Sequence, residues 1–136
     1  MRILYWIDVA LVLGFAAFVL SLWQWNVRYF VGIGMAVVGF VLWMVARVQL
    51  GKSFSVRAQA KALVTKGLYS KFRHPIYLFG ELAIAGLFIA WGELLIGCVY
   101  FAVTVPVQIS RIGNEERVLE EAFREEYRRY KAGTWF

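Results

Sequence analysis

The chain has 136 residues, of which 61% are hydrophobic, and a formal net charge of +6. This apolar share is well above the average for soluble domains, so the composition argues against a soluble globular protein. One cysteine and one histidine are too few for a disulfide framework or for a metal centre built on such ligands. The sequence also lacks basic residues interleaved with base-stacking aromatics. We therefore expect neither a metal nor a nucleic-acid partner.

Four long apolar runs follow one another along the chain. The first contains Asp8 as its only charge, and the third contains only Glu81. A bilayer core about 30 Å thick needs roughly 17–25 helical residues. The first run is too long for the apolar core of a cleaved signal peptide, and no small-residue cleavage site follows it. The sequence predicts a single-domain, all-α integral membrane protein, with transmembrane helices at about 3–25, 28–47, 75–92 and 93–110.

Positive charges gather on one side of the predicted helices. The opposite side shows only Arg28 and Glu93. By the positive-inside rule we expect both termini and the long link between the second and third helices in the cytoplasm, at a bacterial or archaeal inner membrane. Membrane lipids with anionic headgroups are expected partners of the same charges. The cytoplasmic cations are Arg47, Lys52, Arg57, Lys61, Lys66, Lys71, Arg73, Arg111, Arg117, Arg124, Arg128, Arg129 and Lys131.

Local patterns predict how these helices pair and how the chain ends. Gly32 and Ala36 are small residues four apart, a spacing that lets membrane helices approach closely. The short turn at 91–93 predicts an antiparallel hairpin of the last two transmembrane helices. Beyond it, apolar residues at helical spacing predict a cytoplasmic amphipathic helix at about 114–131, with Asn114 as its N-cap.

Ionisable and polar residues cluster where the third apolar run begins. His74, the only histidine, lies between Arg73 and Pro75, and proline is favoured in the first turn of a helix. Tyr77 and Glu81 follow at spacings of three and four, so they share one helix face with His74. An ionisable group inside a membrane normally faces the helix bundle and finds a partner there. We therefore expect this face to point into the protein.

Each of these residues alone has a simpler interpretation. Arg73 suits a headgroup anchor, His74 a polar cap and Tyr77 an interfacial aromatic belt. Glu115 and Glu116 suit the first turn of a helix, where the helix dipole favours acids. What favours a functional site is that a buried acid, several polar groups and an acidic helix start are expected to meet at one membrane face.

Several stretches of the sequence, taken in order, match the pattern of a known family. From about 50 to 130, the chain resembles the isoprenylcysteine carboxyl methyltransferase family, which is related to the membrane phospholipid N-methyltransferases. That family has a Gly-x-Tyr turn, an Arg-His-Pro-x-Tyr motif, an Arg-Ile-x-x-Glu-Glu motif and spaced aromatic residues on a closing helix. The matching residues are LGKSFS (50–55), LVTKGLYSKFRHPIY (63–77), RIGNEERVL (111–119), Phe123, Tyr127 and Tyr130.

The resemblance implies that the cofactor is S-adenosylmethionine and places Arg111 at the reaction centre. It also implies a role for the turn at 67–69. One departure is visible, because many members have glycine two residues after the motif tyrosine, where this chain has Phe79, followed by Gly80. The cofactor-binding residues implied in this way are Tyr69, Arg73, His74, Tyr77, Gly80, Glu115, Glu116 and Tyr127.

The chemistry of the acceptor decides which further residues would act. A carboxylate is already an anion at neutral pH, so Arg111 would only orient it. An amine must lose a proton, for which Glu81 or Glu116 is the candidate base. The expected acceptor is lipid-like or prenylated and enters from the bilayer, with a carboxylate favoured over a phospholipid amine. Two alternatives stay open: an NADPH-dependent membrane reductase related to sterol reductases, and a non-enzymatic membrane scaffold.

Overall fold

The computed structural model describes residues 2–21, 23–51 and 63–135, with side chains described from Trp6 onward. The elements in these ranges are all helical, which confirms the predicted all-α class. Lys52, Arg57, Lys61 and most of the LGKSFS stretch lie outside the described residues. The elements are α1 (Arg2–Ser21), α2 (Val27–Leu50), the 3₁₀ helix η2 (Gly67–Ser70), α3 (Pro75–Trp91) and α4 (Leu94–Ala132).

Two of the described helices, α2 and α4, are long and apolar enough to cross a membrane by length and composition. The helices α1 and α3 are apolar but shorter. The helix α1 ends at Ser21 rather than near residue 25, because the chain turns before Asn26 caps α2. The Asn26 side chain accepts a hydrogen bond from the Tyr29 backbone amide at 2.7 Å. The prediction of four transmembrane helices therefore stays a prediction.

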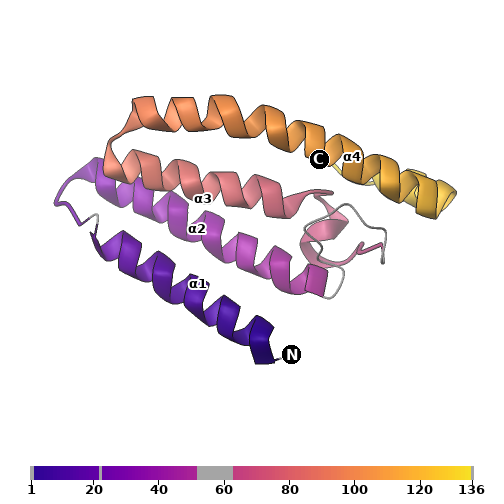
Figure 1. Cartoon of the computed structure of the whole chain (residues 1–136), viewed down its shortest axis with the longest axis horizontal. Coiled ribbons are helices and arrows are strands. Elements are labelled where there is room, and N and C mark those ends of the chain that lie inside the picture. The colour runs from indigo at the N-terminus through magenta and orange to yellow at the C-terminus, as the bar shows by residue number, and fades with distance from the viewer. Residues whose placement is uncertain (1, 22, 52–62, 136) are drawn as a thin grey trace.

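The core of the bundle is the contact between α2 and α3, which lie side by side (Figure 1). Small residues form this contact, as the spacing of Gly32 and Ala36 predicted. A Cβ atom placed on Gly32 would come within 2.6 Å of the Gly86 carbonyl oxygen and 2.8 Å of the Ala90 Cα. The two backbones therefore touch directly, and Gly39 meets Ala83 in the same way about two turns further along α2.

The contacts between α1 and the outer side of α2 include an ion pair, an aromatic stack and a hydrogen bond that the Tyr29 hydroxyl donates to the Val19 carbonyl at 3.2 Å. Arg47 Nε lies 2.8 Å from Asp8 Oδ1, and the rings of Phe15 and Phe40 stack with centroids 4.1 Å apart. Asp8, the only acid of the first apolar run, therefore has its ion-pair partner on the neighbouring helix.

The helices α3 and α4 form the predicted hairpin. Gly92 adopts the left-handed conformation (φ 90°) that ends α3, and its N–H donates to the Phe88 carbonyl at 2.9 Å. The predicted boundary between two helices at about residues 110–114 was wrong. The chain is helical without interruption past Asn114, which lies inside α4 instead of capping a new helix. An ion pair one turn apart, Arg111 to Glu115 at 3.2 Å, holds this part of the helix together.

The real break in α4 comes ten residues later, at Arg124, whose backbone angles (φ 43°, ψ −112°) are not helical. Past this point the chain runs back along α4, so Arg128 reaches Glu120 at 3.0 Å. Figure 1 shows the C-terminus returning to the middle of α4. We call residues 125–135 the C-terminal arm. It brings the end of the chain over the start of α3, where the Trp135 amide donates to the Lys71 carbonyl at 2.8 Å.

Candidate functional site

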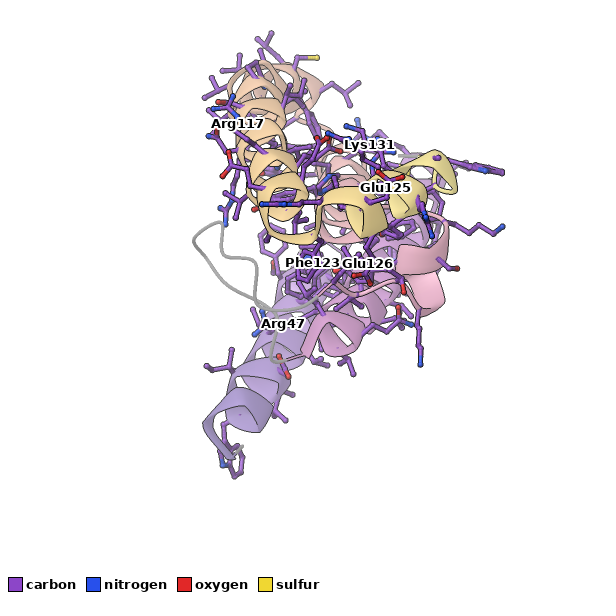
Figure 2. All side chains as sticks on the ribbon, turned by 90° about the vertical axis from the view of Figure 1, so that its right-hand side faces the viewer. Arg47, Arg117, Phe123, Glu125, Glu126 and Lys131 are labelled. Carbon is purple, nitrogen blue, oxygen red and sulfur yellow. The ribbon has the colours of Figure 1, made fainter. Side chains whose placement is uncertain are left out.

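The predicted site residues lie at the end of the bundle where α3 begins, α4 emerges from its apolar run and the C-terminal arm folds back. Figure 2 looks onto this end of the molecule, with Lys131 and Arg117 on opposite sides of α4. On the Arg117 side there is an open hollow of about 510 Å³. Its lining contains none of the predicted site residues, and consists of Arg117, Glu120, Glu121, Arg124 and Arg128. The predicted site residues lie instead on the side of Lys131, which contacts Glu116.

Glu116 of α4 is the centre of the first group of contacts. Its Oε1 accepts a hydrogen bond from Arg73 Nε at 3.0 Å and lies 3.3 Å from His74 Nε2. Its Oε2 accepts from Lys131 Nζ at 2.7 Å. His74 is only 7% exposed, so it is held between the helices rather than placed in solvent. Arg73 and His74, which lie 43 and 42 positions from Glu116 in sequence, thus meet at its carboxylate.

Glu115, the neighbouring acid, organises a second group. Its Oε1 accepts from the Tyr77 hydroxyl at 2.6 Å and from Arg111 Nε at 3.2 Å. The Arg111 guanidinium also lies over the Tyr77 ring, 5.7 Å from its centroid. This geometry lets the tyrosine ring stabilise the cation while its hydroxyl holds the acid. The predicted reaction-centre arginine therefore lies directly beside the predicted cofactor residues.

Tyrosines from η2 and the C-terminal arm pack beneath these charges. Tyr69 is buried, and its carbonyl accepts a hydrogen bond from the Tyr130 hydroxyl at 2.7 Å. Tyr127 is 1% exposed. Its hydroxyl has no hydrogen-bond partner within the described part of the chain. Because a buried hydroxyl without a partner is unfavourable, this atom is suited to meet a polar group that enters the site.

Two predicted residues lie away from this cluster. Glu81, one turn further into α3 than Tyr77, accepts a hydrogen bond from the Gln108 amide of α4. Gly80 faces α2 instead, where a Cβ atom would come within 3.3 Å of the Trp43 ring. The structure therefore gives Gly80 a packing contact with Trp43 and does not bring it to the other cofactor candidates.

The sequence matches the phospholipid methyltransferase family over residues 27–126. This range covers most of the chain and includes Arg73, His74, Glu115 and Glu116, whereas Lys131 follows it. The chain belongs to the phospholipid methyltransferase family. Membership indicates a membrane methyltransferase, in keeping with the long apolar helices. No curated protein and no solved structure matches the chain.

Burial and neighbouring charges determine which side chains of the candidate site are protonated at neutral pH. Burial lowers the pKa of His74, although Glu116 opposes the shift. Burial alone would raise the pKa of Glu116, but hydrogen bonds from Lys131 and His74 and the charges of Lys131 and Arg73 bring it below its ordinary value. Burial raises the pKa of Tyr130 to about 12. At neutral pH the site thus combines an ionised Glu116 with a mostly neutral His74.

The lowered pKa of His74 makes stability depend on pH. Below the ordinary histidine value of 6.5, the unfolded chain binds more protons at this residue than the folded protein does. We therefore expect the melting temperature to fall as the pH is lowered from about 7.5 to about 5.5, and to fall less in His74→Gln. Glu116 acts in the same direction only below its ordinary value of 4.5, outside this window. Equal slopes in the two proteins, followed by thermal unfolding in detergent, would contradict this assignment.

The sequence analysis missed three residues that the structure brings to the site. Lys131 was counted only among the cytoplasmic charges, and Thr134 carried no recognisable signal. Lys131 contacts Glu116 and Thr134 contacts Arg73, because the chain reverses direction at Arg124. The sequence has no turn-favouring residue there that would have predicted the reversal. Gln108 could have been found, because an amide inside an apolar run implies a polar partner at the same depth. Among the described residues, no group of three or more potential ligands is arranged to hold a metal ion.

Proposed function

We propose that this protein transfers a methyl group from S-adenosylmethionine to a lipid-like or prenylated acceptor at the cytoplasmic surface of the membrane. The observation that carries the proposal is the meeting of Arg73 and His74 from α3 with Glu116 from α4, at the polar end of apolar helices. Family membership supports the methyltransferase class. The motif pattern supports the finer resemblance to the isoprenylcysteine carboxyl methyltransferases.

The residues present suit this cofactor. Its amino-acid end carries a carboxylate and an ammonium group, and the site offers Arg73 and Glu116 to bind them. The buried Tyr127 hydroxyl supplies one further polar contact, and Tyr77 offers an aromatic face. When bound, the cofactor supplies an electrophilic methyl group on its sulfonium. The protein then has to align the acceptor and exclude water, which is enough to accelerate an in-line displacement.

The same proposal places all four apolar helices across the membrane, with both termini in the cytoplasm. Side chains of α4 such as Leu95, Val99 and Val103 are exposed and apolar, as expected for a surface in contact with lipid tails. Arg73, His74 and Glu116 would then lie just inside the cytoplasmic headgroup region. A soluble cofactor and a bilayer-embedded acceptor can meet at that depth.

The chemistry of the acceptor decides whether Arg111 or Glu81 would act on it. Arg111, held beside Tyr77 and Glu115, is placed to orient a carboxylate. An amine would instead need a proton acceptor. The Gln108 amide binds one oxygen of Glu81, and the other oxygen is buried without a partner among the described residues. Glu81 is therefore the candidate base for an amine.

Replacing Glu81 with glutamine distinguishes the two acceptor classes. We expect methyl transfer to an amine lipid to slow about a hundredfold, in the range that a general base contributes. Transfer to a prenylated carboxylate should stay within about twofold of the wild-type rate, because no proton has to be removed. Glu121→Gln removes an exposed acid outside the site and serves as the control. Equal slowing with both acceptors would show that Glu81 is structural.

The proposal is tested by titrating S-adenosylhomocysteine, the demethylated cofactor, into the detergent-purified protein in a calorimeter. The expected result is binding at micromolar concentrations. A folded sample that binds NADPH and not S-adenosylhomocysteine would overturn the proposal and favour a reductase. A sample that binds neither would favour a scaffold. The family match favours neither of these two alternatives.

A further inference from the structure

The two residues best suited to the amino-acid end of the cofactor are already in contact with the protein's own C-terminus. Lys131 places its ammonium 2.7 Å from Glu116 Oε2. Arg73 Nη1 donates to the Lys131 carbonyl at 3.4 Å and to the Thr134 hydroxyl oxygen at 3.3 Å. The chain end thus offers a cation to the carboxylate and oxygens to the guanidinium. An α-amino acid presents the same two kinds of group.

The attachment of the arm is uneven along its length. Tyr127 is fully buried, and Tyr130 is bound to the Tyr69 carbonyl, so the arm is fixed as far as residue 130. The following residues 131–135, which we call the latch, are held differently. The Lys131 side chain is 44% exposed, and the last contact is the backbone bond from Trp135 to Lys71. Ion pairs of such exposure contribute little to stability, so the latch can detach while the arm stays in place.

From these contacts we infer that the latch is an internal occupant of the site that the proposed function assigns to the amino-acid end of the cofactor, and that it competes with the cofactor for Arg73 and Glu116. The inference rests on the proposed function and adds to it. Binding of the cofactor requires the Lys131 ammonium to leave Glu116 and the oxygens of Lys131 and Thr134 to leave Arg73. The ligand's ammonium and carboxylate then take the same places. Arg73 and His74 keep their contacts with Glu116, so the site itself survives the exchange.

The first experiment removes the competing groups and measures the binding of S-adenosylhomocysteine by calorimetry. Lys131→Met keeps the length of the side chain and loses its charge, and Thr134→Val loses the hydroxyl. We expect Lys131→Met to bind about threefold to fivefold more tightly than the wild type, the gain from removing a partly exposed ion pair. Arg129→Met is the matched control, since Arg129 lies on the same arm, is 81% exposed and pairs only loosely with Glu125 at 3.9 Å.

The second experiment follows the hydrogen exchange of residues 131–135 by mass spectrometry. If the latch leaves, the Trp135 amide loses its bond to Lys71 and exchanges faster when S-adenosylhomocysteine is bound. Slower exchange, together with weaker binding by Lys131→Met, would overturn the inference and show a lid that closes over the ligand. Binding that none of the variants alters would also overturn it while leaving the proposed function intact.

If the proposed function itself is wrong, the binding measurements give a different result. Absence of binding in the wild type and in Lys131→Met, with both proteins folded, would refute the cofactor assignment and the latch together. Binding by Lys131→Met alone would support both, and would show that the latch holds the site more strongly than its exposed ion pair predicts.

Discussion

Replacing Arg73 with alanine is expected to weaken the binding of S-adenosylhomocysteine about tenfold or more. Arg73 is the guanidinium nearest to Glu116 and the start of α3, with its Nε 3.0 Å from the acid. In the proposed complex it binds the carboxylate of the ligand, and a hydrogen bond between charged groups contributes about 1.5–3 kcal/mol. The same change frees the latch oxygens from Arg73, but that gain is smaller because those contacts are 3.3 and 3.4 Å long.

The matched control is Arg117→Ala, which removes the same charge from the same end of the molecule. Arg117 lies on the other side of α4, in the wall of the open hollow (Figure 2). We expect the Arg117→Ala variant to bind S-adenosylhomocysteine within about twofold of the wild type, since an exposed charge that makes no contact with the ligand acts only through screened electrostatics. Equal losses in both variants would mean that net charge, and not Arg73 itself, supports binding. An unchanged affinity in Arg73→Ala would refute the site.

The substitution Gly32→Ala is expected to destabilise the folded protein by about 1–3 kcal/mol, the usual cost of forcing extra atoms into a packed contact. The new methyl group would meet the Gly86 carbonyl and the Ala90 backbone, neither of which can rotate away as a side chain can. The helices α2 and α3 must then separate along the contact that forms the core. Thermal unfolding in detergent measures the loss.

The matched control lies two residues further along the same helix. A Cβ atom on Gly34 would have nothing within 4 Å. Gly34→Ala should therefore leave stability unchanged or raise it by up to about 1 kcal/mol, because alanine is the better helix former. If both variants are equally stable, the backbone contact between α2 and α3 is not what holds the bundle together.

The sequence was informative about the helices because their determinants are local. Apolar runs, the glycine at position 92 and the proline at position 75 act within a few residues, and they predicted α3 and the hairpin closely. The extent of α4 was not predicted. Asn114 resembles an N-cap, but the ion pair between Arg111 and Glu115 favours continuing the helix through it. The reversal at Arg124 depends on contacts of the arm that are distant in sequence.

Much of the candidate site was also predictable, for a related reason. Helical spacing predicted that His74 and Tyr77 share one face of α3. The sequence also predicted that Glu115 and Glu116 lie at the same end of the bundle, and the contacts of His74 with Glu116 and of Tyr77 with Glu115 confirm that these residues meet. Gly80 was placed by analogy, and the structure turns it toward Trp43. The involvement of Lys131 could not be read from the sequence, because a surface lysine in a basic stretch has no local feature that reveals a partner 15 residues away.

We propose that Arg73, His74 and Glu116 together support methyl transfer to a lipid. The most direct measurement incubates the purified protein, reconstituted in vesicles of extracted membrane lipids, with S-adenosylmethionine carrying a tritiated methyl group. Label is expected in the lipid phase with the wild-type protein and with the Arg117→Ala control. Arg73→Ala and Glu116→Gln should transfer less than about a tenth as much. Label that enters the lipid equally with all four proteins would contradict the site. The absence of transfer by a folded wild-type protein, both to these lipids and to a prenylated carboxylate, would contradict the function.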